Sequence, residues 1–217
     1  TATIRADKSE FYDDATFSPR VSLVYSAGEN KEHNFRASYQ TGFKNPSTQD
    51  FFIGFDVDRA ILVGSAPDNL DRRLPNTDLT GRDAYFDSYK LSSVLAFYSA
   101  LGSTGVPDFT ILEPTVTPLV EQEKVTAFDV GYRGKIGPVN IDVNGYYNIY
   151  EGFIANKYVV APVNGSAFDE SGLADIIDAI PNSTSSSLDR NYLQTFQLYT
   201  NSLADVKSYG VVLGLST

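Results

Sequence analysis

The sequence predicts a mainly β fold of long antiparallel strands that run up and down, with helical insertions in two long connections. Three observations lead to this prediction. Apolar and polar residues alternate over long stretches, short polar turns join several of these stretches, and two much longer segments interrupt them. Alternation with a period of two indicates strands, because successive side chains point to opposite faces of a sheet.

The first part of the chain predicts a short strand followed by a hairpin. Residues 1–8 carry a weak strand pattern, and residues 17–26 and 33–43 alternate clearly between apolar and polar side chains. The joining sequence AGENKEH is rich in turn formers and charges, so the two long segments predict a β-hairpin.

A second group of strands follows much later in the chain. Residues 124–135 and 138–153 alternate in the same way, and the sequence KIGP between them predicts a tight turn. Residues 193–217 complete the pattern as a sixth strand. The strands are longer than the usual ~5 to 6 residues of globular proteins. One face is expected to form a continuous apolar surface that includes Phe35, Tyr39, Phe128, Val130, Tyr132, Ile141, Val143, Ile149, Val211 and Leu213.

Two segments without strand alternation, residues 44–122 and 155–191, predict long loops with structure of their own. Helical spacing of apolar residues predicts a helix from about Asp83 to Leu101, with Gly102 as its stop. A shorter helix is expected from about Ser171 to Ile180, ended by a proline. The stretch before the first helix is rich in Pro, Asp, Asn and Gly and is expected to be loop.

The same alternation fits two folds. Periodicity alone favours a soluble, extracellular β-sandwich that binds a ligand, carbohydrate being one example, because soluble sheets are commoner than membrane barrels. Loop lengths favour a segment of an outer-membrane β-barrel, because such barrels combine short periplasmic turns with long extracellular loops. Both long segments leave from the same rim, so the barrel segment is the preferred interpretation.

Composition narrows the possible functions. The formal net charge of −10 argues against a nucleic-acid partner, because phosphate binding needs clustered Lys and Arg. Cys is absent, which excludes disulfides, thiolate metal sites and a Cys nucleophile. Met is absent too, so the chain is interpreted as a fragment or a processed chain. No residue constellation predicts catalysis, a metal site or a cofactor.

The remaining candidate residues are few. His33 is the only histidine and is expected to be a solvated turn residue. The acidic pairs Asp13/Asp14 and Asp56/Asp58 are expected to be solvated, because a chain with 27 Asp and Glu holds such pairs by chance. The first long loop holds a small basic cluster, for which a solvated loop is favoured over contact with an anion, and two aromatic residues, for which packing inside the loop is favoured over ligand stacking. The ligand-binding candidates are Arg72, Arg73, Arg82, Tyr85 and Tyr89.

Three sequence blocks, in order, resemble the barrel region of TonB-dependent outer-membrane receptors. The first is SPRVSLVYS followed by NFRASYQTGFKNPS, in which an arginine-bearing strand runs into a Gly-Phe-basic-x-Pro-Ser segment. The second is EQEKVTAFDVGYRGK followed by VNIDVNGYYNIYEGFI, and the third is TNSLADVKSYGVVLGLS. In the third block Val212 stands where relatives often have an acidic residue. The large helical insertion resembles SusC-like nutrient importers.

The resemblance implies that the whole chain, residues 1–217, is part of the barrel of a Gram-negative outer-membrane transporter and not an enzyme. It implies active uptake of a scarce small nutrient, such as a glycan, peptide or metal chelate. The partners would be the TonB energy-transducing complex, acting through a plug domain outside this chain, and for a SusC-like protein a surface lipoprotein. Polar residues expected to face the barrel lumen are Arg36, Gln40, Asp129, Arg133, Asp142 and Asn144.

Overall fold

The computed structural model describes residues 1–8 and 15–217, which divide into two compact units. Unit 1 contains residues Thr1–Asn45, Gln122–Phe153 and Ser202–Thr217, and unit 2 contains Pro46–Glu121 and Ile154–Asn201. The chain therefore passes twice from unit 1 into unit 2 and back. Among the described residues no helix is both long enough and apolar enough to cross a membrane.

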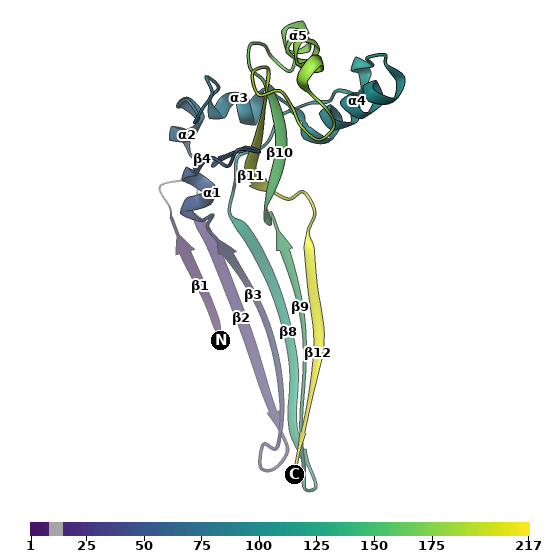
Figure 1. Ribbon diagram of the computed structural model, residues 1–217. Coiled ribbons are helices and arrows are strands. Elements are labelled where there is room, and N and C mark those ends of the chain that lie inside the picture. The colour runs from purple at the N-terminus through teal and green to yellow at the C-terminus, as the bar shows by residue number, and fades with distance from the viewer. Residues whose placement is uncertain (9–14) are drawn as a thin grey trace. The chain divides into compact units, whose positions relative to one another are not determined.

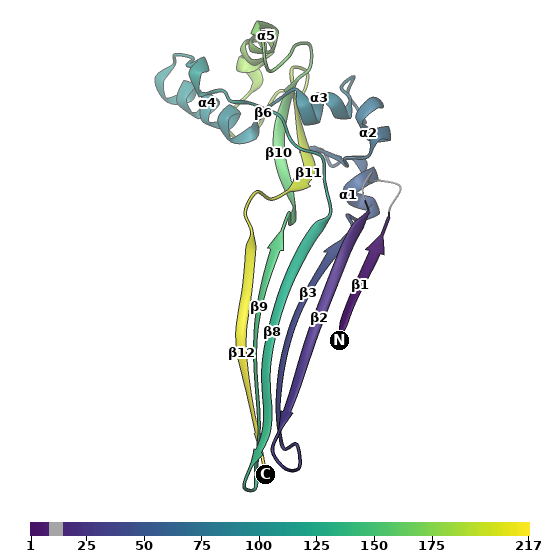
Figure 2. The same ribbon diagram turned by 180° about the vertical axis from the view of Figure 1, so that it is seen from behind.

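Unit 1 is a single six-stranded antiparallel sheet (Figures 1 and 2). The strand order is β1-β2-β3-β8-β9-β12, so each strand pairs with the unit 1 strands that come before and after it along the chain. Its strands are β1 (Ala2–Asp7), β2 (Thr16–Ala27), β3 (His33–Lys44), β8 (Glu123–Ile136), β9 (Val139–Glu151) and β12 (Val206–Ser216). The mainly β, up-and-down fold predicted from the alternation is confirmed.

The pairing register places the apolar residues of all these strands on one face. Opposed residues in an antiparallel pair share a face, and Val21, Tyr39, Phe128, Tyr147 and Tyr209 follow one another across the sheet in a single row. The neighbouring row on the side of the short turns is apolar in the same way, whereas the row on the other side contains Thr41, Thr126 and Lys207. The ten residues expected to share this face do so. Large members of the face are exposed, Val211 by 76%, so this face is not the buried core of a sandwich.

The two short turns of unit 1 lie at the same end of its sheet. Because His33 pairs with Gly134, the β2–β3 turn and the β8–β9 turn are adjacent. Positive φ angles of +95° at Gly28 and +60° at Gly137 close these turns, a backbone conformation that glycine adopts at little cost. The four points where the chain leaves or re-enters unit 1 lie at the opposite end of the strands.

Unit 2 has a mixed sheet of its own with strand order β4-β5-β11-β10-β6-β7. Strand β5 runs parallel to β11, and the other pairs are antiparallel. The strands are β4 (Gly54–Asp56), β5 (Ile61–Val63), β6 (Ser88–Lys90), β7 (Pro114–Thr115), β10 (Ile154–Pro162) and β11 (Leu193–Asn201). The helices are α1 (Thr48–Phe52), α2 (Pro67–Asp71), α3 (Gly81–Phe86), α4 (Leu91–Thr104), α5 (Glu170–Ala179), η1 (Phe109–Ile111) and η2 (Ile180–Asn182).

Helices cover both faces of this second sheet. Val159 and Val160 are successive residues of β10 and therefore point to opposite faces, and each belongs to a different hydrophobic cluster. The cluster around Val159 includes residues of α3, and the cluster around Val160 includes residues of α4 and α5. Figures 1 and 2 show α2 and α3 on one side of β10 and β11, with α4 and α5 on the other. Unit 2 is thus a three-layer unit with two cores.

The prediction of one long helix from Asp83 to Leu101 is wrong, because the chain forms two helices there. The Asp87 amide donates the closing bond of α3 to the Asp83 carbonyl at 3.1 Å. The Ser88 hydroxyl donates to the carbonyls of Asp83 (3.0 Å) and Ala84 (2.9 Å), so at Ala84 it takes the place of the backbone amide that would continue the helix. Strand β6 follows and pairs with β10, and then α4 begins. This second helix runs past Gly102 and ends at Gly105, whose φ of +70° is typical of a helix C-terminus.

Other boundaries also differ from the sequence expectation. The single strand expected over residues 193–217 is two strands, β11 and β12, which belong to different sheets. Residues 155–191 are not only loop, because β10 extends to Pro162. The segment before α3, expected to be loop, contains β4, β5 and α2. The short helix expected near Ser171–Ile180 is present as α5, and the Asp169 side chain caps its first turn.

Candidate functional site

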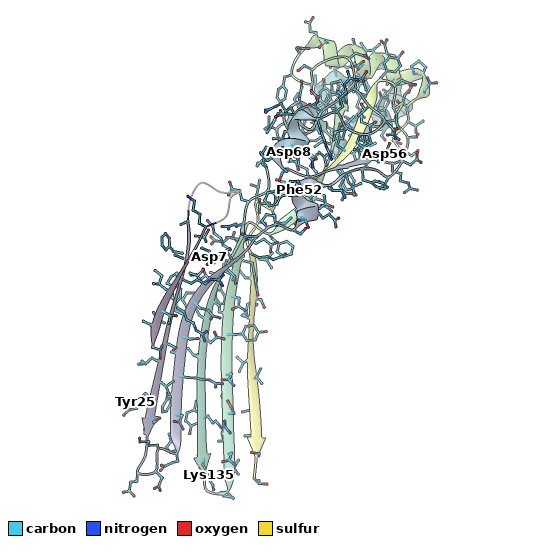
Figure 3. The ribbon with its side chains drawn as sticks, turned by 90° about the vertical axis from the view of Figure 1, so that its left-hand side faces the viewer. Asp7, Tyr25, Phe52, Asp56, Asp68 and Lys135 are labelled. Atoms are coloured by element: carbon cyan, nitrogen blue, oxygen red, sulfur yellow. The ribbon has the colours of Figure 1, made fainter. Side chains whose placement is uncertain are left out.

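The polar face of the unit 1 sheet is the first candidate site. Arg36, Gln40, Asp129, Arg133, Asp142 and Asn144 all lie on the face opposite the apolar rows, as their register in β3, β8 and β9 requires. Figure 3 shows the side chains projecting from this sheet. Their grouping on one face follows from period-two alternation, which is why the sequence alone identified them.

An arginine-centred network occupies the middle of this polar face. Arg36 donates to the Asn144 side-chain oxygen, and its guanidinium lies 3.8 Å from Asp142. Asn144 in turn donates to Asp142 at 2.8 Å. Ser38 donates to Asp129 at 3.2 Å in the row next to Arg36. The network joins the charged residues of β3 and β9 across the intervening strand.

Gly131 makes the contact between β3 and β9 possible. It lies in β8 between Arg36 and Asn144, in the same row. A Cβ atom there would lie 2.4 Å from Arg36 Nε and 2.5 Å from Asn144 Oδ1, so any side chain would displace the network. Gln40 and Arg133 share the polar face but lie outside these contacts. Sequence reasoning missed the part played by Gly131, although a glycine inside a strand pattern indicates close approach of neighbours.

The three arginines named as candidates in the first long segment do not form a basic cluster. Arg73 pairs with Asp78 and Arg82 pairs with Asp71, each at 2.6 Å. The Arg72 guanidinium lies over Gly54, where a Cβ atom would meet its Nη2 at 2.1 Å. Exposed ion pairs of this kind contribute little to stability.

Tyr85 and Tyr89 are core residues, with 0% and 1% of their surface exposed. The Tyr85 hydroxyl donates to the carbonyls of Tyr199 (2.9 Å) and Val63 (3.1 Å). The hydroxyl is therefore hydrogen-bonded, and the ring is buried, within unit 2. Burial raises the pKa of Tyr85 and raises the pKa of Tyr89 to about 12. Of the two interpretations given for these rings, their burial supports packing inside unit 2.

Two residues expected to be solvated have specific partners. His33 Nδ1 lies 2.8 Å from the Tyr132 hydroxyl, and the two rings stack. Asp56 has a side chain only 10% exposed. Burial acts to raise the pKa of Asp56, but hydrogen bonds from Arg190 and Asn76 outweigh burial and lower it. Asp58 is solvated as expected, with its side chain fully exposed. Asp13 and Asp14 lie outside the described residues.

Metal-ligating side chains do not gather in the described parts of the chain. Within residues 1–8 and 15–217, no group of three or more His, Asp or Glu side chains is arranged to hold a metal ion.

Residues 1–217 match the family model described as TonB dependent receptor-like, beta-barrel. The chain therefore belongs to this family, and its sheets are part of a β-barrel protein of the Gram-negative outer membrane. The alternative of a soluble β-sandwich is overturned by this match. The predictions of family, fold class and location are confirmed, and the SusC-like subfamily stays a prediction.

No curated protein matches the chain. Among solved structures, it is similar to the crystal structure of the siderophore receptor PirA from Acinetobacter baumannii, with 11% sequence identity and a TM-score of 0.46. The match covers 98% of this chain and 22% of that receptor. The chain thus spans less than a quarter of the length of the solved receptor.

Proposed function

We propose that this chain is part of a receptor that imports a scarce nutrient across the outer membrane by TonB-dependent active transport. The observation that carries the proposal is the two-faced sheet of unit 1 in a chain of this family. Its apolar rows suit contact with lipid, and the arginine-centred network on the opposite face suits a water-filled lumen. Arg36, Asp129, Asp142 and Asn144 would then face the lumen or a plug domain, together with Gln40 and Arg133.

Unit 2 would lie outside the cell and capture the nutrient. Support comes from the ends of the unit 1 sheet: the two short turns are at one end, and the chain leaves for unit 2 from the other. Outer-membrane barrels place short turns in the periplasm and long segments outside. Residues 44–122 and 155–191 would accordingly be extracellular, as an ordered unit with two cores.

The energy and the partners come from outside this chain. A plug domain would contact the TonB complex, which transmits energy from the inner membrane, and a SusC-like receptor would also bind a surface lipoprotein. The nutrient classes open to the receptor are a glycan, a peptide and a metal chelate. The chain itself would perform no covalent chemistry and would need no cofactor.

Uptake by the intact receptor tests the proposal. The host gene is deleted, and transport of radiolabelled glycans, peptides and metal chelates is compared with the parent strain. We expect uptake of one class to disappear with the receptor, and to disappear equally when TonB is removed or a protonophore collapses the proton gradient. Receptor-dependent uptake that continued without TonB would contradict active transport.

A further inference from the structure

A cavity of about 600 Å³ lies within unit 2, beside the face of the sheet that α4 covers. Its walls come from four places in the sequence: the first turns of α4, the β4–β5 turn, residues 185–190, and the start of β11. Small-molecule sites have volumes of about 300 to 1,000 Å³, so the cavity is large enough for a ligand of drug or short-oligosaccharide size. Asp58 lines it too, whereas none of the ligand-binding candidates named from the sequence does.

Arg190 fixes two of these walls relative to one another. Its Nη2 donates to Asp56 at 2.8 Å (Asp56 is labelled in Figure 3), its Nη1 donates to the Asp58 carbonyl at 3.0 Å, and its Nε donates to Gln194 at 3.2 Å. All three nitrogen positions of the guanidinium are thus engaged, and Asp56 balances its charge. Gln194 is only 2% exposed, which anchors this contact in the protein interior. Arg190 therefore builds the cavity and is not free to bind a ligand.

Arg59 supplies a cation without a partner at the cavity wall. The turn that carries it is tightly held, because Val57 donates to the Ala60 carbonyl at 3.0 Å and the Asp58 amide donates to the Asp56 carboxylate at 2.8 Å. Within residues 1–8 and 15–217 the Arg59 guanidinium makes no ion pair or side-chain hydrogen bond. In a chain with a net charge of −10, a free arginine on a rigid turn facing a cavity is a candidate anion contact.

The rest of the lining suits a ligand rich in hydroxyl groups. Ser185, Ser187 and Thr195 line the cavity, and their hydroxyls make no hydrogen bond to another residue that the structure describes. Leu91 and Leu95 of α4 supply an apolar wall against which ring carbons pack. Leu91 is also the first residue of α4, and no side chain caps this end, so the positive end of the helix dipole adds to the preference for an anion.

We propose that this cavity binds a hydroxyl-bearing carboxylate, with Arg59 pairing with the carboxylate and the serine and threonine hydroxyls contacting the ligand's own hydroxyls. The inference names the substrate class of the receptor. The role of this binding in uptake rests on the proposed function. A short uronic-acid oligosaccharide and a hydroxycarboxylate such as citrate share this chemistry, and the experiment separates them.

Calorimetric titration of the purified intact receptor tests the site. The probes are trigalacturonate, citrate and the neutral maltotriose. We expect one of the two acids to bind and maltotriose not to bind measurably. Arg59→Ala should weaken that binding at least about tenfold, because a charge-assisted hydrogen bond is lost, and Arg59→Lys should retain part of it. Arg73→Ala is the matched control: it removes an exposed arginine of the same unit that lies outside the cavity, and should leave binding unchanged.

The outcomes separate the site from the transport proposal. Three outcomes would each overturn the carboxylate site: neither acid binds, maltotriose binds as well as the acid, or Arg59→Ala keeps full affinity with unchanged thermal unfolding. TonB-dependent uptake of another nutrient would then still support the proposed function. Conversely, Arg59-dependent binding of an acid by a receptor that shows no TonB-dependent uptake would support the site and contradict the transport proposal.

Discussion

Replacing Val211 with arginine should strongly destabilise the barrel in lipid, whereas the same change at Val212 should have little effect. The two valines are adjacent in β12 and are both exposed, by 76% and 58%. Val211 lies in the apolar row of Val130 and Gly145, whereas Val212 pairs with Asn144 on the polar face. The pair therefore compares the two faces at one height in the sheet.

The register also gives the depth of Val211. The rows of this face that carry apolar side chains run from Ile136 to Thr126 of β8, whose row contains Ile149, a span of ten residues by subtraction of their numbers. Ten residues at ~3.4 Å each extend about 34 Å along the strand, and a tilt of ~40° reduces this to about 26 Å along the membrane normal, close to the ~25 Å apolar band of such barrels. Val130 lies six residues from one limit and four from the other, so its row, with Val211, lies near the midplane.

An arginine at the midplane of a barrel's lipid face costs about 2 to 4 kcal/mol, which is roughly a 30- to 700-fold change in the folding equilibrium. At Val212 we expect a change below about 0.5 kcal/mol, as for an ordinary polar surface site. The assay is urea-dependent folding of the intact receptor into phospholipid vesicles, followed by the heat-sensitive migration of folded barrels on gels. Equal losses for the two variants, or a larger loss at Val212, would refute the assignment of the faces.

Three further predictions test other parts of the molecule. Cysteines introduced at Asp78 and Glu29 should differ in their labelling by a membrane-impermeant thiol reagent. In intact cells the reagent should label the cysteine at 78, and it should label the one at 29 only after the outer membrane is broken. Labelling of both in intact cells would overturn the topology. Gly131→Val should displace the arginine–asparagine contact on the polar face and cost about 1 to 3 kcal/mol in the same folding assay, and an unchanged urea midpoint would show that the contact contributes nothing. Asn69, which is 2% exposed, donates to three backbone carbonyls at 2.8 to 3.2 Å. Asn69→Leu should therefore destabilise unit 2 by about 1 to 3 kcal/mol in hydrogen-exchange measurements, whereas the exposed neighbour changed as Asp68→Leu should not.

The sequence by itself determined the strands of unit 1 and the nature of their faces. Alternation is a local property, because the geometry of an extended chain sends successive side chains to opposite sides without reference to any partner. The assignment of Arg36 and Asn144 to one polar face therefore needed no structure. Their direct contact did need it, because it depends on the register of three strands and on the glycine that separates the two side chains.

Only the tertiary structure decided the organisation of unit 2. Residues 193–217 are predicted as one strand, because no local signal shows that the first part pairs with β10 and the second with β9. The helix break at Ser88 depends on β6 pairing with β10, about seventy positions later in the chain by subtraction of residue numbers. Arginines close together in sequence take different partners, whereas Arg190 meets the β4–β5 turn from 134 positions away. These features come from contacts between distant segments, whose free energy outweighs local preference and leaves no periodic trace in the sequence.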